Sequence, residues 1–295
     1  MRAVVVCLVV LGCGRLRFEP ATGGDSAADA TCWPAWRDGS VTLSAPREIT
    51  ELSSGFPQAD PSPSYDGLTL YYVVAEGNSD LYYATRATTQ DPWTGRGPIS
   101  ELDTTSTETK LTVTRDGLTG VYSSDRNGSM NNDLWATTRA TAGAQWGAPT
   151  QVPVAGLETS RDDYDPHLTP DGSSLYYAPQ QPSGGQAIVQ TSRATTADPF
   201  AIVRTLTELS TPPYSDPTVS PDELVIVFVT GAQADLYMAT RTDRLAMFGP
   251  VTPVPGVNDP VAHDADSELS PDGCTLYFSS DRTGTKDLYV ADVLQ

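Results

Sequence analysis

Acidic side chains recur at fixed distances before five predicted turns, and they are the residues of this chain best suited to chemistry. Each turn contains an aspartate, at Asp66, Asp116, Asp171, Asp222 or Asp272. Counting six and four residues back from these turns gives the candidate site residues Asp60, Lys110, Asp165, His167, Asp216, Asp266 and Glu268. Carboxylates that share one site repel one another, so their pKa values rise unless a lysine or a bound cation offsets the charge. Paired carboxylates also provide the acid and the base of glycoside hydrolysis.

The residues around these turns predict a repeated all-β unit. An apolar and aromatic run follows each turn, such as Leu175-Tyr176-Tyr177, and a second run follows a loop, such as Asp235-Leu236-Tyr237. The repeats follow one another at intervals of 50 to 55 residues, and no amphipathic helical period is present. Short strands and turns at such a period are typical of a β-propeller with one four-stranded blade per repeat. The first strand of each blade lines the channel, so strand alternation predicts that the candidate side chains face it.

The fifth repeat ends after its third strand, and we predict its fourth strand at the other end of the chain. Residues 45–54 match the fourth strands of other repeats, for example 97–102. We therefore expect a five-bladed propeller over residues 45–295 that the N-terminal strand closes, with a six-bladed ring as the alternative. Closure of the ring removes the exposed sheet edges that promote aggregation.

The first residues of the chain have the composition of an export signal. One arginine precedes an apolar run of nine residues, which is too short to span a bilayer. The end of this run, Val10-Leu11-Gly12-Cys13, resembles a bacterial lipobox, whose cysteine is lipidated. We expect a signal peptide at 1–12, lipidation at Cys13 and a flexible linker at 13–44. The alternatives are plain secretion and a buried N-terminal strand.

Two cysteines, Cys32 and Cys274, remain after signal removal and lipidation. Two remaining cysteines in an oxidising compartment favour a disulfide. Cys274 begins the second strand of the fifth blade, and Cys32 precedes the predicted fourth strand of the same blade. Because alternate strands of a blade begin at the same end, this placement favours a bond between them. The alternative is two unpaired thiols.

The overall composition excludes some classes of function. Acidic residues number 37 against 18 basic residues, which gives a net charge of −19 and excludes nucleic acid as a partner. Two histidines, His167 and His263, leave little room for a multi-histidine metal centre. The stretch Asp125-x-Asn127-x-Ser129-x-Asn131-x-Asp133 resembles the start of a calcium loop, but Ala136 stands where that loop has glutamate. We interpret it as a polar hairpin loop and predict no metal site and no cofactor, although a cation in the channel would relieve the aspartate ring.

The repeat resembles that of a known family. The propeller repeat of TolB-like proteins, which are relatives of the WD repeat, is similar to Ser270-Pro271-Asp272-Gly273-x-x-Leu276-Tyr277-Phe278-Ser279-Ser280-Asp281-Arg282-x-Gly284-x-x-Asp287-Leu288-Tyr289. Asp125-Arg126-x-Gly128 and Asp133-Leu134-Trp135 repeat this motif in the second blade. The resemblance covers residues 45–295 and implies a propeller with a binding role in the cell envelope. TolB itself is six-bladed, has an extra N-terminal domain and works with envelope partners, whereas this chain has five repeats and a linker.

Together these features favour a non-catalytic scaffold over an enzyme. We expect a monomeric outer-membrane lipoprotein that faces the periplasm or the cell surface of a Gram-negative bacterium and binds an envelope protein or polysaccharide. The alternatives are a secreted protein and, for activity, a glycoside hydrolase of the five-bladed arabinanase type that uses the channel carboxylates. A residue that recurs in every blade is better explained by a structural role, such as binding backbone amides, than by catalysis.

Overall fold

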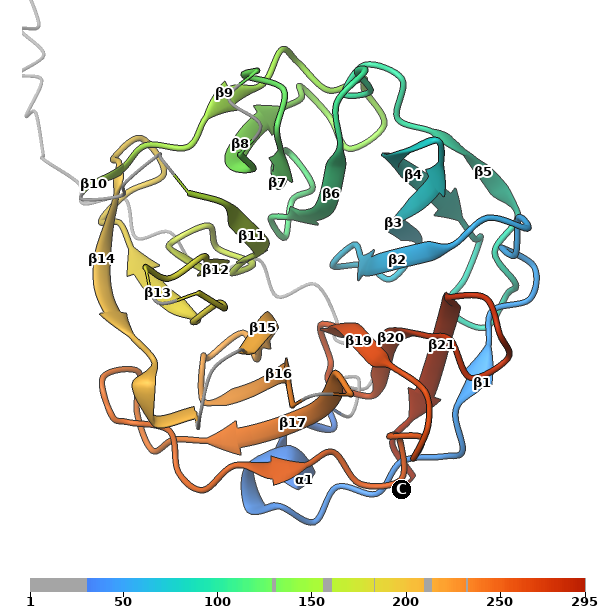
Figure 1. The fold of residues 1–295 in the computed structure, drawn as a ribbon, viewed down its shortest axis with the longest axis vertical. Helices are drawn as coiled ribbons and strands as arrows, with labels where there is room; N and C mark the ends of the chain where they lie inside the picture. Colours follow the sequence, from blue (N-terminus) through green and yellow to red (C-terminus); the bar gives the residue numbers. More distant parts are fainter. Residues whose placement is uncertain are drawn as a thin grey trace, which may run out of the picture. The chain divides into compact units, whose positions relative to one another are not determined.

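The protein is a ring of five β-sheets arranged radially around one axis (Figure 1). The structure is a computed structural model, and it describes residues 31–128, 131–155, 161–182, 184–209, 214–231 and 233–294. The first strand of each blade, which precedes the turn aspartate, lies innermost (Figure 1). The predicted five-bladed propeller is confirmed, and the six-bladed alternative is wrong.

Four blades follow one another along the chain, each built from the axis outward. Blade 1 consists of β2 (Gln58–Pro63), β3 (Thr69–Glu76), β4 (Asn78–Thr85) and β5 (Gly95–Pro98). Blade 2 consists of β6 (Glu108–Val113), β7 (Thr119–Ser124), β8 (Asp133–Thr138) and β9 (Thr150–Gln151). Blade 3 consists of β11 (Asp163–Leu168), β12 (Ser174–Pro179), β13 (Val189–Ser192) and β14 (Phe200–Thr205). A 3₁₀ turn, η1 (Thr207–Leu209), leads to blade 4, which consists of β15 (Tyr214–Val219), β16 (Val225–Thr230), β17 (Asp235–Thr240) and β18 (Thr252–Pro253).

Blade 5 closes the ring with strands from both ends of the chain. It consists of β19 (Asp264–Leu269), β20 (Thr275–Ser280), β21 (Asp287–Asp292) and β1 (Arg47–Glu48). β1 pairs antiparallel with β21, with Arg47 opposite Val290, as expected for the N-terminal strand. Blade 3 departs from the four-strand pattern, because β10 (Val154–Ala155) pairs parallel with its outer strand β14 as the chain passes from blade 2 to blade 3 (Figure 1).

The hydrophobic core is divided among the five interfaces between neighbouring blades. Each interface has its own cluster of buried apolar and aromatic side chains. Because a blade is covered on both faces, its second strand is largely buried, as in β16, where every residue is buried. The blades therefore hold one another through packing at their faces, and the innermost strands are fixed from both sides.

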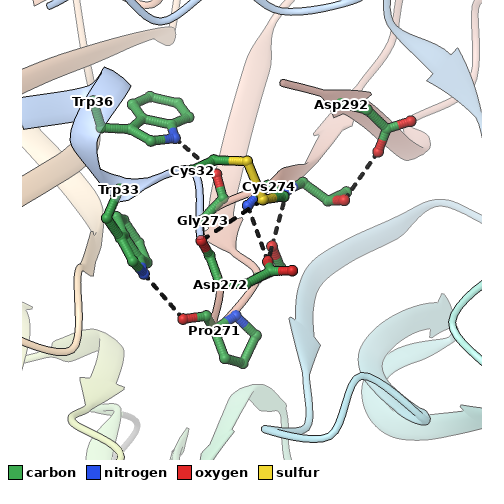
Figure 2. Close-up of a disulfide and its surroundings, with 10 residues drawn as sticks. Cys32, Trp33, Trp36, Pro271, Asp272, Gly273, Cys274 and Asp292 are labelled. Atoms are coloured by element: carbon green, nitrogen blue, oxygen red, sulfur yellow. Dashed lines mark hydrogen bonds between the residues drawn. A yellow bond between two sulfur atoms is a disulfide. The ribbon is translucent and has the colours of Figure 1, made fainter. Parts of the chain in front are cut away.

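Residues 31–44, which we assigned to a flexible linker, pack against the propeller. Helix α1 (Trp33–Asp38) buries Trp33 and Trp36 in the apolar cluster between blades 4 and 5. The predicted disulfide is present and joins Cys32, at the start of α1, to Cys274, with Cα atoms 4.9 Å apart (Figure 2). The linker assignment fails here because a helix of six residues is too short to show a hydrophobic period.

The predicted signal peptide at 1–12, the lipidation site Cys13 and the linker residues 14–30 lie outside the described residues. Within the part of the chain that the structure describes, no helix has the length and hydropathy of a membrane span.

In each of the first four blades, a repeated arginine after the third strand contacts an aromatic ring and a turn of its own blade. These residues are Arg86, Arg139, Arg193 and Arg241. Each guanidinium stacks on an aromatic ring of its own blade at 4.0 to 4.5 Å. Each Nε also donates a hydrogen bond of 2.7 to 2.8 Å to the carbonyl of the residue after the turn aspartate. Three of the four reach a tyrosine hydroxyl of the preceding blade, so one side chain fixes a turn, a strand and an interface.

In blade 5, α1 takes over the role of this arginine. Val293 stands at the arginine position, since its N–H donates to Cys274 O in the way that Arg139 N donates to Leu118 O. Trp36 Nε1 donates to Gly273 O at 2.8 Å, which is the carbonyl that the arginine binds in the other blades (Figure 2). The Trp33 ring covers Gly273 so closely that a Cβ on this glycine would lie 2.8 Å from it.

Candidate functional site

The five residues at the innermost predicted position share one backbone irregularity. The ring position is held by Asp60, Lys110, Asp165, Asp216 and Asp266, and each has φ between 50 and 55°. At this point the pairing of every first strand with its second strand shifts in register. Such a bulge re-aims a side chain, and aspartate tolerates left-handed φ better than most residues. We predicted simple alternation, and the structure shows instead a bulge in every blade.

The bulges bring the aspartates of different blades together at the axis. Carboxylate oxygens of Asp60, Asp216 and Asp266 lie within 4.8 Å of one another. Asp165 joins them, because its Oδ2 accepts a hydrogen bond of 3.3 Å from the backbone N–H of Asp216. Lys110 also lies close to the axis, where it is fully buried. The structure therefore brings together all five predicted ring residues.

A second layer, four residues before the turns, is held together by Glu268. Lys110 Nζ lies 3.3 Å from Glu268 Oε2, and Thr218 Oγ1 donates to Glu268 Oε1 at 2.9 Å. His167 Nδ1 lies 3.0 Å from Glu268 Oε1. His167 Nε2 accepts a hydrogen bond of 3.4 Å from Val219 N–H, so Nδ1 carries the proton that faces the carboxylate. Glu268, in blade 5, is thus bound by side chains of blades 2, 3 and 4.

Burial and mutual repulsion divide the ring carboxyls into two kinds. Burial, followed by the charge of Asp266, raises the pKa of Asp60 to about 7. The same two causes raise the pKa of Asp216 to about 6. Burial and then the charge of Asp216 raise the pKa of Asp165 well above its usual range. Asp266 differs: burial acts to raise its pKa, but Lys286, Ser279 and Lys110 together outweigh burial and lower it.

Lys286 is a site residue that the sequence analysis missed. It lies in the loop between β20 and β21, and its Nζ is 2.6 Å from Asp266 Oδ2. Its charge also offsets part of the rise in the pKa values of Asp60 and Asp216. Counting back from the turns could not find a residue in this loop. The available signal was its rarity, since Lys286 and Lys110 are the two lysines of the whole chain.

The space beside the second layer is small, and Trp33 is part of its lining. The cavity has a volume of about 40 Å³, and its lining includes Trp33, Tyr65, His167 and Glu268. Such a volume holds about one or two water molecules. Sites for small organic ligands usually measure roughly 300 to 1,000 Å³. The second layer therefore offers polar groups without room for a sugar ring.

A larger hollow lies on the outside of the ring between blades 1 and 2. Its volume is about 500 Å³, and its lining includes Tyr71, Tyr83, Glu101, Arg139 and Trp146. Arg139 donates to Tyr71 Oη at 2.9 Å, and Glu101 Oε1 accepts from Trp146 N–H. Aromatic rings with a few placed polar groups are typical of a ligand-binding surface.

The ring aspartates are able to hold a cation. Calcium binds oxygen ligands at roughly 2.3 to 2.6 Å, so two ligands of one ion lie up to about 5 Å apart. The separation of up to 4.8 Å among Asp60, Asp216 and Asp266 fits that limit. Asp60 accepts no hydrogen bond from the described residues. Lys286 already neutralises Asp266, so a cation would have to compete with its ammonium group.

Comparison with known proteins shows similarity of fold without similarity of sequence. No protein-family model matches the chain, and no curated protein matches it. Among solved structures, a putative TolB from Agrobacterium tumefaciens is similar over 85% of this chain and 87% of its own, with 18% identity and a TM-score of 0.51. The α-L-arabinofuranosidase PaAbf62A from Podospora anserina is similar over 86% of this chain and 96% of its own, with 14% identity and a TM-score of 0.55.

TolB from Acinetobacter baumannii is longer than this chain. The similarity covers 82% of this chain and 56% of that protein, with 16% identity and a TM-score of 0.49. The chain thus spans little more than half the length of this TolB. The comparisons define a β-propeller with distant structural similarity to TolB-like proteins and to other propellers, and they define nothing finer.

Proposed function

We propose that the protein is a non-catalytic binding scaffold of the cell envelope, exported and anchored by a lipid at Cys13. The observation that carries this proposal is the contrast between the axis and the outer surface. The second-layer carboxylate Glu268 is bound by His167, Lys110 and Thr218 beside a cavity of about 40 Å³. The hollow between blades 1 and 2 is more than ten times larger, at about 500 Å³.

A glycoside hydrolase needs more space than the cavity beside Glu268 offers. Inverting enzymes place their two carboxyls roughly 6.5 to 9.5 Å apart and retaining enzymes about 5 to 5.5 Å apart, with the sugar between them. The ring oxygens of Asp60, Asp216 and Asp266 lie within 4.8 Å of one another. This spacing suits a shared proton or cation better than a substrate. We therefore favour the scaffold over the glycoside hydrolase alternative.

The location outside the cytoplasm has independent support. Disulfides such as Cys32–Cys274 form and persist in oxidising compartments. Lipidation at Cys13 would add an anchor to an exported protein, in agreement with the signal-like first residues.

The hollow between blades 1 and 2 gives the proposal a testable surface. Tyr83 is its exposed aromatic ring. We expect Tyr83→Ser to weaken binding of the purified protein to envelope polysaccharides or to a cross-linked envelope protein at least tenfold, because it removes the accessible ring. Leu245→Ser is the matched control, since Leu245 is exposed in blade 4. Binding to both classes of partner is measured by affinity electrophoresis and by photo-cross-linking in native envelopes.

The enzyme alternative makes the opposite prediction. Release of reducing sugars by the wild-type protein, lost in Asp165→Asn, Asp216→Asn and Glu268→Gln, would overturn the scaffold proposal. Binding that survives these substitutions and is lost in Tyr83→Ser would support it.

A further inference from the structure

Each first strand begins at a position eight residues before the turn aspartate, and this position is acidic in three blades. The acidic residues are Glu108 in blade 2, Asp163 in blade 3 and Asp264 in blade 5. Two of them have an arginine partner from the loop after the second strand of their own blade. Arg126 lies 3.1 Å from Glu108, and Arg282 lies 2.6 Å from Asp264.

A comparison of the five blades shows how the acid at this position and its arginine partner occur together. Blades 1 and 4 have neither partner, because Gln58 and Tyr214 replace the acid and no arginine follows the second strand there. The acid and the arginine are therefore present together or absent together in four blades. Blade 3 is the exception, since it keeps Asp163 while Gln181 stands at the place of the arginine. The equivalence is set by register: Asp163 pairs with Pro179 as Glu108 pairs with Ser124.

The unpaired carboxylate of blade 3 is deeply buried beside a second one. Asp163 is 1% exposed, and so is Asp133 of blade 2. Asp163 Oδ2 and Asp133 Oδ1 accept no hydrogen bond within the described part of the chain. No lysine, arginine or histidine among the described residues forms an ion pair with either carboxylate.

The backbone holds these two residues next to each other across the blade boundary. Asp163 N–H donates to the carbonyl of Asn132, the residue before Asp133, at 2.8 Å. Asn127 Nδ2 donates to the other oxygen of Asp133. Buried charges in proteins are paired or coordinate metals, so this pair lacks a positive partner.

We propose that a divalent cation of the calcium type binds between blades 2 and 3 at Asp133 and Asp163, in place of the guanidinium that binds the equivalent acid in blades 2 and 5. The available donors are oxygens, which calcium prefers to nitrogen or sulfur. Two carboxylates balance its double charge.

The ion would make the interface between blades 2 and 3 depend on external calcium. A site with only two carboxylates predicts a dissociation constant in the range of extracellular modules, about 10⁻⁴ to 10⁻³ M. This inference does not depend on the scaffold proposal, because the ion would stabilise the propeller whether or not the protein binds a partner.

The test is thermal unfolding of the full-length protein, with its disulfide formed, after EDTA treatment and dialysis. Calcium chloride at ten to a hundred times the dissociation constant should raise Tm by about 2 to 5 °C. Asp163→Asn should abolish this rise. Gln181→Arg should abolish it as well and should raise Tm without calcium, because it supplies blade 3 with the arginine of blades 2 and 5. The gain in Gln181→Arg keeps the test valid if Asp163→Asn fails to fold.

Asp60→Asn is the control, because it alters a different carboxylate cluster of the propeller, at the axis. A calcium-induced rise in Tm that persists in Asp60→Asn and disappears in Gln181→Arg supports the proposal. The proposal is overturned if calcium leaves the Tm of the wild-type protein unchanged, if Gln181→Arg retains the full response, or if Asp60→Asn removes it. Isothermal titration with calcium on the same variants measures the affinity directly.

Discussion

The ring aspartates owe their recurrence to backbone geometry as much as to charge. A left-handed φ costs most side chains of the order of 1 kcal/mol or more, and aspartate is among the residues that bear it best. This explains why four of the five ring positions are aspartate without any appeal to catalysis. The aspartates differ in their polar partners. Asp266 forms an ion pair with Lys286, and Asp216 accepts a hydrogen bond from the Ser215 hydroxyl. Asp60 is 5% exposed and has no such partner among the described residues.

The raised pKa of Asp60 makes stability depend on pH. Its folded-state pKa of about 7 lies above the roughly 3.9 of an unfolded aspartate. The folded protein therefore binds more protons between these values, and the free energy of unfolding falls as pH rises through that window. We expect the Tm of the wild-type protein to decline between pH 4.5 and 7.5, and Asp60→Asn to make this decline shallower. Calorimetry at a series of pH values measures both slopes.

Asp171→Asn is the control for this experiment. The pKa of Asp171 is lowered, because hydrogen bonds from Ser173 and Thr169 outweigh its burial. Its contribution to stability is lost only as pH falls below about 4, so this variant should keep the wild-type slope above pH 4.5. Equal slopes in the wild-type protein and Asp60→Asn would show that Asp60 titrates normally.

At the scale of elements, the N-terminal segment supplies blade 5 with contacts that the other blades form within their own repeats. Four blades use an arginine to bind the carbonyl after the turn aspartate, and blade 5 uses Trp36 of α1 for the same carbonyl. The disulfide then holds α1 beside that turn. The sequence predicted the disulfide from strand order, because Cys32 and Cys274 flank strands of one blade. It did not predict α1, because the two tryptophans of a six-residue helix give no periodic pattern.

Removal of the Trp36 hydrogen bond should destabilise the protein by a modest amount. Trp36→Phe leaves Gly273 O without its donor, which typically costs about 1 to 2 kcal/mol. Cys32→Ser with Cys274→Ser should cost more, about 5 kcal/mol in the chain-entropy model, because the bond closes a loop of 242 residues. Urea unfolding of both variants gives the two values. The assignment of α1 as a replacement for the arginine fails if Trp36→Phe matches the wild-type protein, while Arg139→Ala, which removes the same bond in blade 2, is destabilised.

At the scale of the whole molecule, the repeat made the architecture predictable and left the fine structure of the site open. The spacing of the turns fixed the number of blades, and the match of residues 45–54 to other fourth strands fixed how the ring closes. The ring position was found by counting, yet the bulge at Asp60 and its equivalents was not, because register against a partner strand is not visible in one strand. Lys286 and Trp33 were missed for a related reason. Lys286 comes from a loop between strands, and Trp33 comes from α1, which lies outside the repeat.

Ring closure by β1 allows a test in which the same residues are moved along the chain. A protein that begins at Gly55 lacks β1 and α1, so the edge of β21 and the apolar cluster between blades 4 and 5 become exposed. We expect it to aggregate or to lose cooperative unfolding, since an uncovered edge strand pairs with other chains. A permutant that carries residues 31–54 after Gln295, joined by a flexible linker of about ten residues, should fold as a monomer with a Tm near that of the wild-type protein. Val293 N–H donates a hydrogen bond to Cys274 O, and Cys274 is bonded to Cys32, so the moved segment starts close to its native place. A stable monomer from the truncated protein would show that β1 is dispensable, whereas rescue by the permutant would show that position in the ring, and not order in the chain, is what closes the propeller.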